Sequence, residues 1–100
     1  MVIIAKSTLT LFAEKHALAS EPLEKWYNHV VGTDWSCLAD IKKDFNSVDF
    51  VGNDRYVFNI KGNDFRLVAM IHFSVRTVYV KFIGTHDEYD KIDARTVNRK

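Results

Sequence analysis

The spacing of apolar residues changes once along this chain, and that change is the strongest constraint on its fold. Before about Ser47, apolar residues recur at the three-to-four spacing of amphipathic helices. After it they alternate with other residues, as they do in half-buried strands. Helices followed by a run of strands predict an α+β domain. Because one hundred residues form one modest core, we expect a single domain spanning residues 1–100.

The first half predicts one strand and three helices. "MVIIA" is apolar and β-branched, which is typical of a short buried strand. Ser7 or Thr8 then offers an N-cap for a first helix. A second helix has Pro22 in its first turn and Gly32 at its end, and "TDWSCLADIKKDF" predicts a third.

The second half predicts three antiparallel strands and a short, charged C-terminal helix. "RYVFNIK", "FRLVAMIHF" and "TVYVKFIG" are rich in β-branched and aromatic residues. Gly62 and Asn63 favour a two-residue hairpin turn between the first two. We therefore expect the N-terminal strand and helices to pack on one face of a mainly antiparallel sheet.

Strand alternation predicts one apolar face and one cationic face. On the last strand, Val78, Val80 and Phe82 are expected to share the apolar side. The opposite face of the sheet gathers Asn59, Lys61, Arg66, Tyr79 and Lys81. Residues 53–81 carry five basic and two acidic groups, a balance of +3, although the whole chain carries only +1. Aligned cations with an aromatic ring suit phosphates and stacked bases, but an ordinary solvated sheet face has the same composition.

The segment "IGTHDEYDKID" places His86 and Tyr89 three residues apart just after the last strand. Metal-free cleavage of RNA needs a proton carrier for the 2′-hydroxyl and cations for the phosphate, and histidine and arginine or lysine fill these roles. A structural alternative is that His86 merely begins the final helix, whose positive end Asp87 and Glu88 would favour. No second histidine stands at ligand spacing, so we expect no metal and no cofactor.

Cysteine content and hydropathy bear on the compartment. A lone Cys37 excludes an internal disulfide, which favours a reducing cytoplasm. No apolar run approaches the length of a membrane span, so no membrane association is expected.

Three strings, "ADIKKDF", "VFNIKGNDFRLV" and "VYVKFIGTHDEYDKIDA", closely resemble the HigB toxins of bacterial type II toxin–antitoxin modules, within the RelE-like superfamily. The resemblance runs from Met1 through Ala94. It implies a RelE-like fold and an mRNA interferase that cuts mRNA during translation on the 70S ribosome. It also implies a partner antitoxin, HigA, through which promoter DNA is bound. "WSCLADIKK" departs from the family pattern at Cys37 and Leu38, at a helix start and away from the expected site.

By position, the resemblance implies catalytic roles for Lys61, Arg66, His86 and Tyr89. His86 would act as general base or acid, Lys61 and Arg66 would contact the phosphate, and Tyr89 would stack on a base or transfer a proton. Strand position adds Lys81 to the phosphate contacts, and Asp90 is a possible orienting partner for His86. The expected RNA-binding residues are Lys81, Asn59, Arg55 and Tyr79.

The sequence is also compatible with two functions that involve no catalysis. A non-catalytic module could hold RNA or a protein on the same face and tolerate loss of His86. An inactivated toxin could act as a corepressor with its antitoxin and retain only the partner surface.

Overall fold

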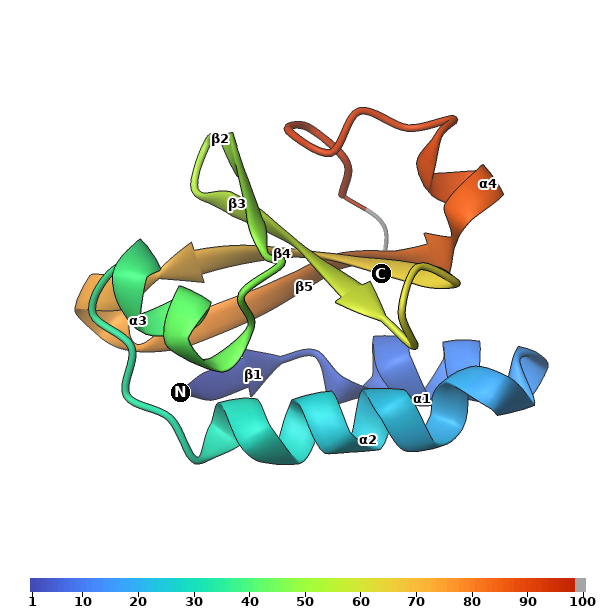
Figure 1. The fold of residues 1–100 in the computed structure, drawn as a ribbon, viewed down its shortest axis with the longest axis horizontal. Coiled ribbons are helices and arrows are strands. Elements are labelled where there is room, and N and C mark those ends of the chain that lie inside the picture. The colour runs from blue at the N-terminus through green and yellow to red at the C-terminus, as the bar shows by residue number, and fades with distance from the viewer. Residues whose placement is uncertain (99–100) are drawn as a thin grey trace.

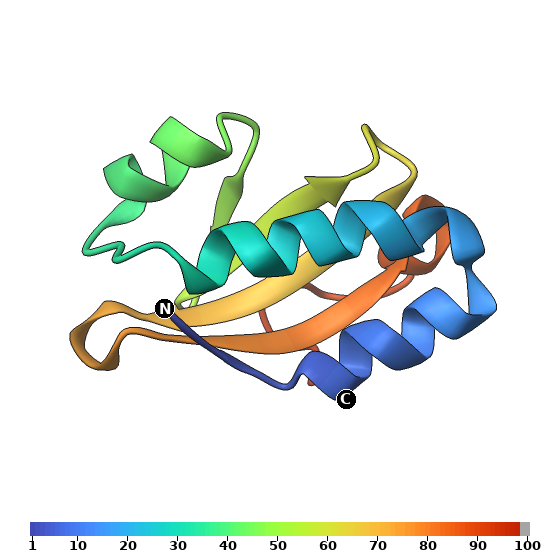
Figure 2. The ribbon, with the colours of Figure 1, turned by 90° about the horizontal axis from the view of Figure 1, so that it is seen from below.

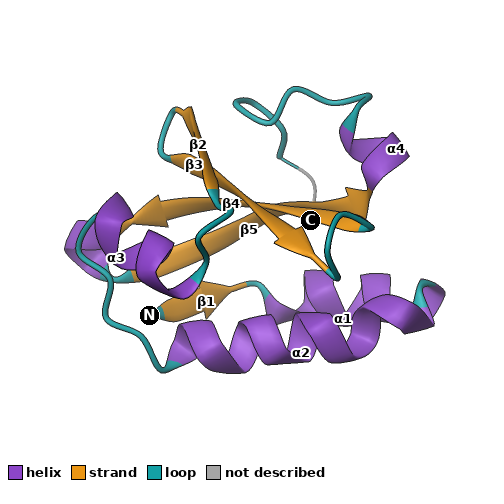
Figure 3. Ribbon diagram, in the orientation of Figure 1, coloured by secondary structure: helices purple, strands orange, loops and turns teal. Residues whose placement is uncertain are grey.

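The computed structural model describes residues 1–98 and shows a five-stranded sheet with its two longest helices on one side and its short last helix on the other (Figures 1 and 3). This arrangement confirms the predicted α+β class. In chain order the elements are β1 (Val2–Ile4), α1 (Lys6–Lys15), α2 (Ala17–Val31), α3 (Leu38–Asp44), β2 (Asp49–Gly52), β3 (Arg55–Ile60), β4 (Phe65–His72), a 3-10 turn (Phe73–Val75), β5 (Thr77–Thr85) and α4 (His86–Tyr89).

The strands are ordered β1-β5-β4-β3-β2 across the sheet. β1 runs parallel to β5, and every other neighbouring pair is antiparallel. β2 was not predicted, because "DFVG" is short and ends in glycine. No helix within residues 1–98 is long and apolar enough to cross a membrane.

The first face of the sheet carries the main core under α1 and α2 (Figure 2). Leu23 and Trp26 of α2 are buried there with Phe58 and Leu67 of the sheet. The Trp26 and Phe58 rings meet edge to face with centroids 5.4 Å apart. Burying such side chains contributes about 1.5–3 kcal/mol each, so this layer dominates the stability of the fold.

Local predictions near α1, α2 and the first hairpin need correction. α1 begins at Lys6, ahead of Ser7 and Thr8, and no side chain caps it. Pro22 lies inside α2, not in its first turn. Because proline has no N–H, the carbonyl four residues earlier, that of Leu18, lacks its helical partner, but Leu18 is exposed to water. Gly32 ends α2 as predicted.

The hairpin between β3 and β4 closes through four residues, not two. Ile60 pairs with Phe65, so the turn comprises residues 61–64. Lys61 and Gly62 both have positive φ, of 52° and 63°, and the Asp64 N–H donates to the Lys61 carbonyl at 3.2 Å. Lys61, a predicted phosphate contact, is the first residue of this turn.

A β-bulge in β5 overturns the predicted alternation of that strand. Val80 pairs with Ala69, but Phe82 pairs with Val68, so the register shifts between them. The extra residue turns Phe82 onto the second face of the sheet and leaves Ile83 against the main core. Phe82 therefore does not share a face with Val80.

The chain after α4 covers part of the second face (Figure 1). Ala94 packs in a small core with Val57, Val68 and Phe82. Tyr89, Ile92 and Val97 pack against the same group. The cationic face predicted from alternation is thus partly an apolar interface within the molecule.

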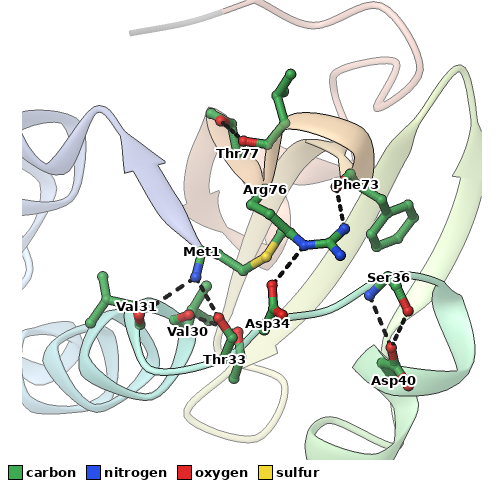
Figure 4. Close-up of polar contacts among 11 residues, drawn as sticks. Met1, Val30, Val31, Thr33, Asp34, Ser36, Asp40, Phe73, Arg76 and Thr77 are labelled. Atoms are coloured by element: carbon green, nitrogen blue, oxygen red, sulfur yellow. Dashed lines mark hydrogen bonds and ion pairs between the residues drawn. The ribbon is translucent and has the colours of Figure 1, made fainter.

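The end of the molecule that holds the N-terminus is fastened by polar contacts (Figure 4). The Met1 amino group donates to the Val31 carbonyl at 3.5 Å and to the Thr33 carbonyl. The Arg76 guanidinium, in the turn before β5, lies 2.6 Å from the Asp34 carboxylate. These contacts join the N-terminus to the end of α2, and the segment after α2 to the turn before β5.

Candidate active site

The strand–helix junction that delivers His86 is set by a capping box. The Glu88 N–H donates to Thr85 Oγ1 at 3.2 Å, and the Thr85 N–H donates to Glu88 Oε1 at 2.8 Å. These reciprocal bonds fix the start of α4 within one turn. The acids around His86 are therefore partly helix-start residues, as the structural alternative predicted. His86 and Tyr89 lie within that same short helix.

A second tether joins α4 to the β3–β4 turn. The His86 N–H donates to the Asp64 carbonyl at 3.2 Å, and the Asp64 carboxylate lies 3.0 Å from Lys61 Nζ. Both segments lie at one end of the sheet (Figure 1). Asp64 therefore links Lys61 to His86, and no sequence signal identified this role in advance.

Two further contacts complete the cluster. Arg66 of β4 pairs with Gly84 of β5, and its guanidinium carbon lies 5.8 Å from the centre of the Tyr89 ring. His86 Nδ1 lies 3.2 Å from Asp90 Oδ2, with both side chains about half exposed. The structure thus brings Lys61, Arg66, His86 and Tyr89 to one surface, which we call the α4 cluster.

Burial raises the pKa of the Tyr89 phenol above its usual value near 10, and the nearby Arg66 opposes this shift. Tyr89 therefore keeps its proton at neutral pH. A half-buried, protonated phenol beside a guanidinium can donate a proton or stack on a base.

Of the remaining predicted residues, Asn59 pairs with Arg66 beside the α4 cluster, whereas Tyr79, Lys81 and Arg55 lie apart from it. Lys81 and Tyr79 are neighbours, with Nζ 5.7 Å from the ring centre, and Lys81 also donates to the Asn98 side chain at 3.1 Å. Along β4 and β5, the buried Val68 and Phe82 pair separates Tyr79 from the Arg66 end. Tyr79 and Lys81 thus form a second polar patch.

Arg55 is a structural residue in this fold. It is only 7% exposed, and its guanidinium donates to the Ala94 carbonyl at 3.5 Å and to the Val97 carbonyl. Asn53 supports the same segment by donating to the Arg95 carbonyl at 2.8 Å. Arg55 therefore holds the C-terminal segment on the sheet, and its buried guanidinium is not free to contact RNA.

His86 of the α4 cluster also belongs to a group of possible metal ligands. Ligand atoms of His86, Asp87 and Asp90 all lie within 4.8 Å of one another, and all three residues are exposed. Such a set could hold a cation by one imidazole nitrogen and two carboxylates. The acids beside His86 suggest metal binding from the sequence too, but the absence of a second histidine at ligand spacing argued against a metal there.

Comparison with known proteins decides the family. The family described as "HigB_toxin, RelE-like toxic component of a toxin-antitoxin system" matches residues 19–92. The chain belongs to the HigB toxin family. This confirms the resemblance drawn from the three sequence strings.

Relatives in this family carry informative names. The mRNA interferase toxin HigB of Escherichia coli strain K12 is 34% identical to this chain over 104 aligned residues, covering 100% of both. The mRNA interferase HigB of Escherichia coli O6:H1 (strain CFT073) is 32% identical over 94 residues, covering 92% of this chain and 91% of the relative. The mRNA interferase HigB of Shigella flexneri is 34% identical over the full length of both.

Proposed function

We propose that this chain is an endoribonuclease toxin that cleaves mRNA, with the α4 cluster as its active site. The observation that carries the proposal is the juxtaposition of a histidine–carboxylate pair, a cation–aromatic pair and a turn lysine at one end of the sheet. Relatives named mRNA interferases support the substrate class.

In the proposed reaction, His86 accepts the proton of a ribose 2′-hydroxyl. The 2′-oxygen attacks the adjacent phosphorus, and the bond to the 5′-oxygen breaks. A protonated group gives its proton to that leaving oxygen, and Tyr89 holds such a proton at neutral pH, as phenols do, with its pKa raised further by burial. The products are a 2′,3′-cyclic phosphate and a free 5′-hydroxyl, so protons and electrons balance.

Lys61 and Arg66 would stabilise the negative charge that builds on the phosphate. Their charges do not depend on proton transfer, and donors already in position need little reorganisation. The Asp90 carboxylate, 3.2 Å from His86 Nδ1, would orient the imidazole and leave Nε2 toward the substrate.

The partner, the location and the state of the substrate are proposed from membership of the HigB toxin family. We infer an antitoxin partner, HigA, a cytoplasmic location, and mRNA bound to the ribosome as the substrate. Promoter DNA would be contacted only in complex with the antitoxin. The mechanism above requires no metal.

The test is cleavage of one end-labelled mRNA, free and during translation, by wild-type protein and by His86→Ala. General acid–base catalysis contributes on the order of 10²–10⁴-fold, so we expect a loss of that size. His16→Gln, at the junction of α1 and α2, is the matched control and should cleave at the wild-type rate.

Three results would change the proposal. Full cleavage by folded His86→Ala would remove His86 from the chemistry. Loss of cleavage by the wild type in EDTA on free mRNA would instead assign a metal role to His86, Asp87 and Asp90. If folded protein cuts in no arm, the non-catalytic readings replace the nuclease.

A further inference from the structure

A cavity of about 290 Å³ lies beside the α4 cluster, between α2, the end of α3 and the edge of β3. We propose that it binds the base of a nucleotide adjacent to the cleaved phosphodiester bond. This inference rests on the proposed function, because it assigns a second contact to the same RNA. The lining residues are Pro22, Lys25, Trp26, His29, Asp44, Phe45, Asn59, Ile60 and Lys61.

Continuity with the α4 cluster is the first argument. Lys61 lines the cavity and also forms the ion pair with Asp64, whose carbonyl accepts from the His86 N–H. Asn59 lines it too and pairs across the hairpin with Arg66. A nucleotide whose phosphate rests on Lys61 therefore has this cavity within reach of its base.

The open edge of β3 is the second argument. β2 pairs with β3 only as far as Val57, and no other described strand flanks the rest of that edge. Backbone N–H and C=O groups on an open edge are unpaired donors and acceptors. The amide of Asn59 adds one acceptor and two donors. A nucleobase, which carries donors and acceptors along one flat edge, matches this lining.

An orphaned polar group is the third argument. Trp26 is only 3% exposed and lines the cavity, yet its indole Nε1 has no hydrogen-bond partner among the described residues. Buried N–H groups are nearly always paired, and this one is covered in the unbound structure, so a base in the cavity would supply its acceptor after a small displacement of the covering side chains. Trp35 provides the contrast, because its indole donates to Asp44 Oδ2 at 2.9 Å.

Charge explains why the occupant is a neutral base and not a second phosphate. Lys25 is paired with Glu21 at 3.1 Å, and His29 lies 3.5 Å from the Asp44 carboxylate. Asp44 also lines the cavity and would repel an anion placed beside it. The Phe45 ring adds an apolar wall, against which a flat base can pack.

The experiment follows the two indole N–H signals of the ¹⁵N-labelled protein by NMR. The probes are the four nucleoside 5′-monophosphates, with ribose 5-phosphate and inorganic phosphate as arms that lack a base. We expect at least one nucleotide to shift the Trp26 signal saturably, with a smaller effect on Trp35. The two phosphates without a base should leave Trp26 unmoved.

Asn59→Ala should weaken this nucleotide binding and even out the base composition next to the cut sites. Asn28→Ala is the matched control, because Asn28 is an exposed asparagine of α2 outside the cavity. An unmoved Trp26 signal with all four nucleotides, or an equal shift with ribose 5-phosphate, overturns the proposal.

The two proposals fail separately. If the wild type cleaves RNA but no nucleotide moves Trp26, only the base site is lost. If a nucleotide moves Trp26 while His86→Ala cleaves normally, the base site stands and the catalytic assignment falls.

Discussion

Gly84 controls how closely the sheet and α4 can approach, and its replacement by alanine should be costly. A Cβ at this position would lie 2.5 Å and 2.9 Å from two carbons of the Phe82 ring, and 3.1 Å from Glu88 Oε1. Phe82 is 2% exposed and packs in the second core, so its ring has little room to withdraw. Overpacking of this kind costs about 1–3 kcal/mol.

The same substitution disturbs the start of α4. Glu88 Oε1 accepts the Thr85 N–H of the capping box, and loss of a helix cap costs about 1 kcal/mol. Together the two effects give a loss of about 2–4 kcal/mol in the free energy of unfolding. At roughly 4–8 °C per kcal/mol, Tm should fall by at least about 8 °C.

Urea unfolding and thermal denaturation measure the effect, with Gly32→Ala as the matched control. A Cβ at Gly32 would meet its nearest atom at 3.5 Å, an ordinary contact, and its φ of −87° suits alanine. Gly84→Ala should also cleave RNA more slowly than its folded fraction predicts, because His86 and Tyr89 are displaced. Equal unfolding midpoints for Gly84→Ala and wild type would refute the close-approach argument.

Three further outcomes are expected. Lys61→Glu should weaken RNA binding and reduce the slope of log affinity against log salt by about 0.7. Lys42→Glu on α3 is the control and should change neither the affinity nor the slope. Equal slopes for Lys61→Glu and wild type would show that Lys61 does not contact the phosphate. Arg55→Met should lower the free energy of unfolding by about 1–3 kcal/mol in urea titrations, because two carbonyls lose a charged donor. The segment after Tyr89 should also become sensitive to proteases. Unchanged proteolysis would contradict the anchoring role. Burial raises the pKa of both Tyr56 and Tyr89 above 10, so the unfolded chain loses these protons first and the free energy of unfolding should fall as pH rises past about 10. Urea titrations at neutral pH and above pH 10 test this. The unfolding midpoint of Tyr89→Phe should fall less between the two pH values than that of wild type, and an equal fall would exclude the Tyr89 contribution.

Much of this protein is determined by local sequence. The switch from helical to alternating spacing near Ser47 correctly predicted helices followed by antiparallel strands, because each spacing reports which side of one element is apolar. The family was identified from three short strings and is confirmed. His86 and Tyr89 were placed together because they lie three residues apart in one helix.

Other features were decided only by the tertiary structure. The bulge that sends Phe82 to the second face depends on how β5 pairs with β4, and a period of two cannot reveal an inserted residue. The sequence around Arg55 predicts an exposed cation. It is buried because the C-terminal segment folds over it, and the residues that accept its hydrogen bonds lie 39 to 42 positions away along the chain.

The link between Lys61 and His86 is likewise tertiary, since it passes through the Asp64 carbonyl in a turn far from α4 in sequence. The cavity at Trp26 exists because α2, α3 and the open edge of β3 meet there. Sequence therefore supplied the residue types and their local faces. Long-range packing, which no local spacing encodes, decided which of those residues meet.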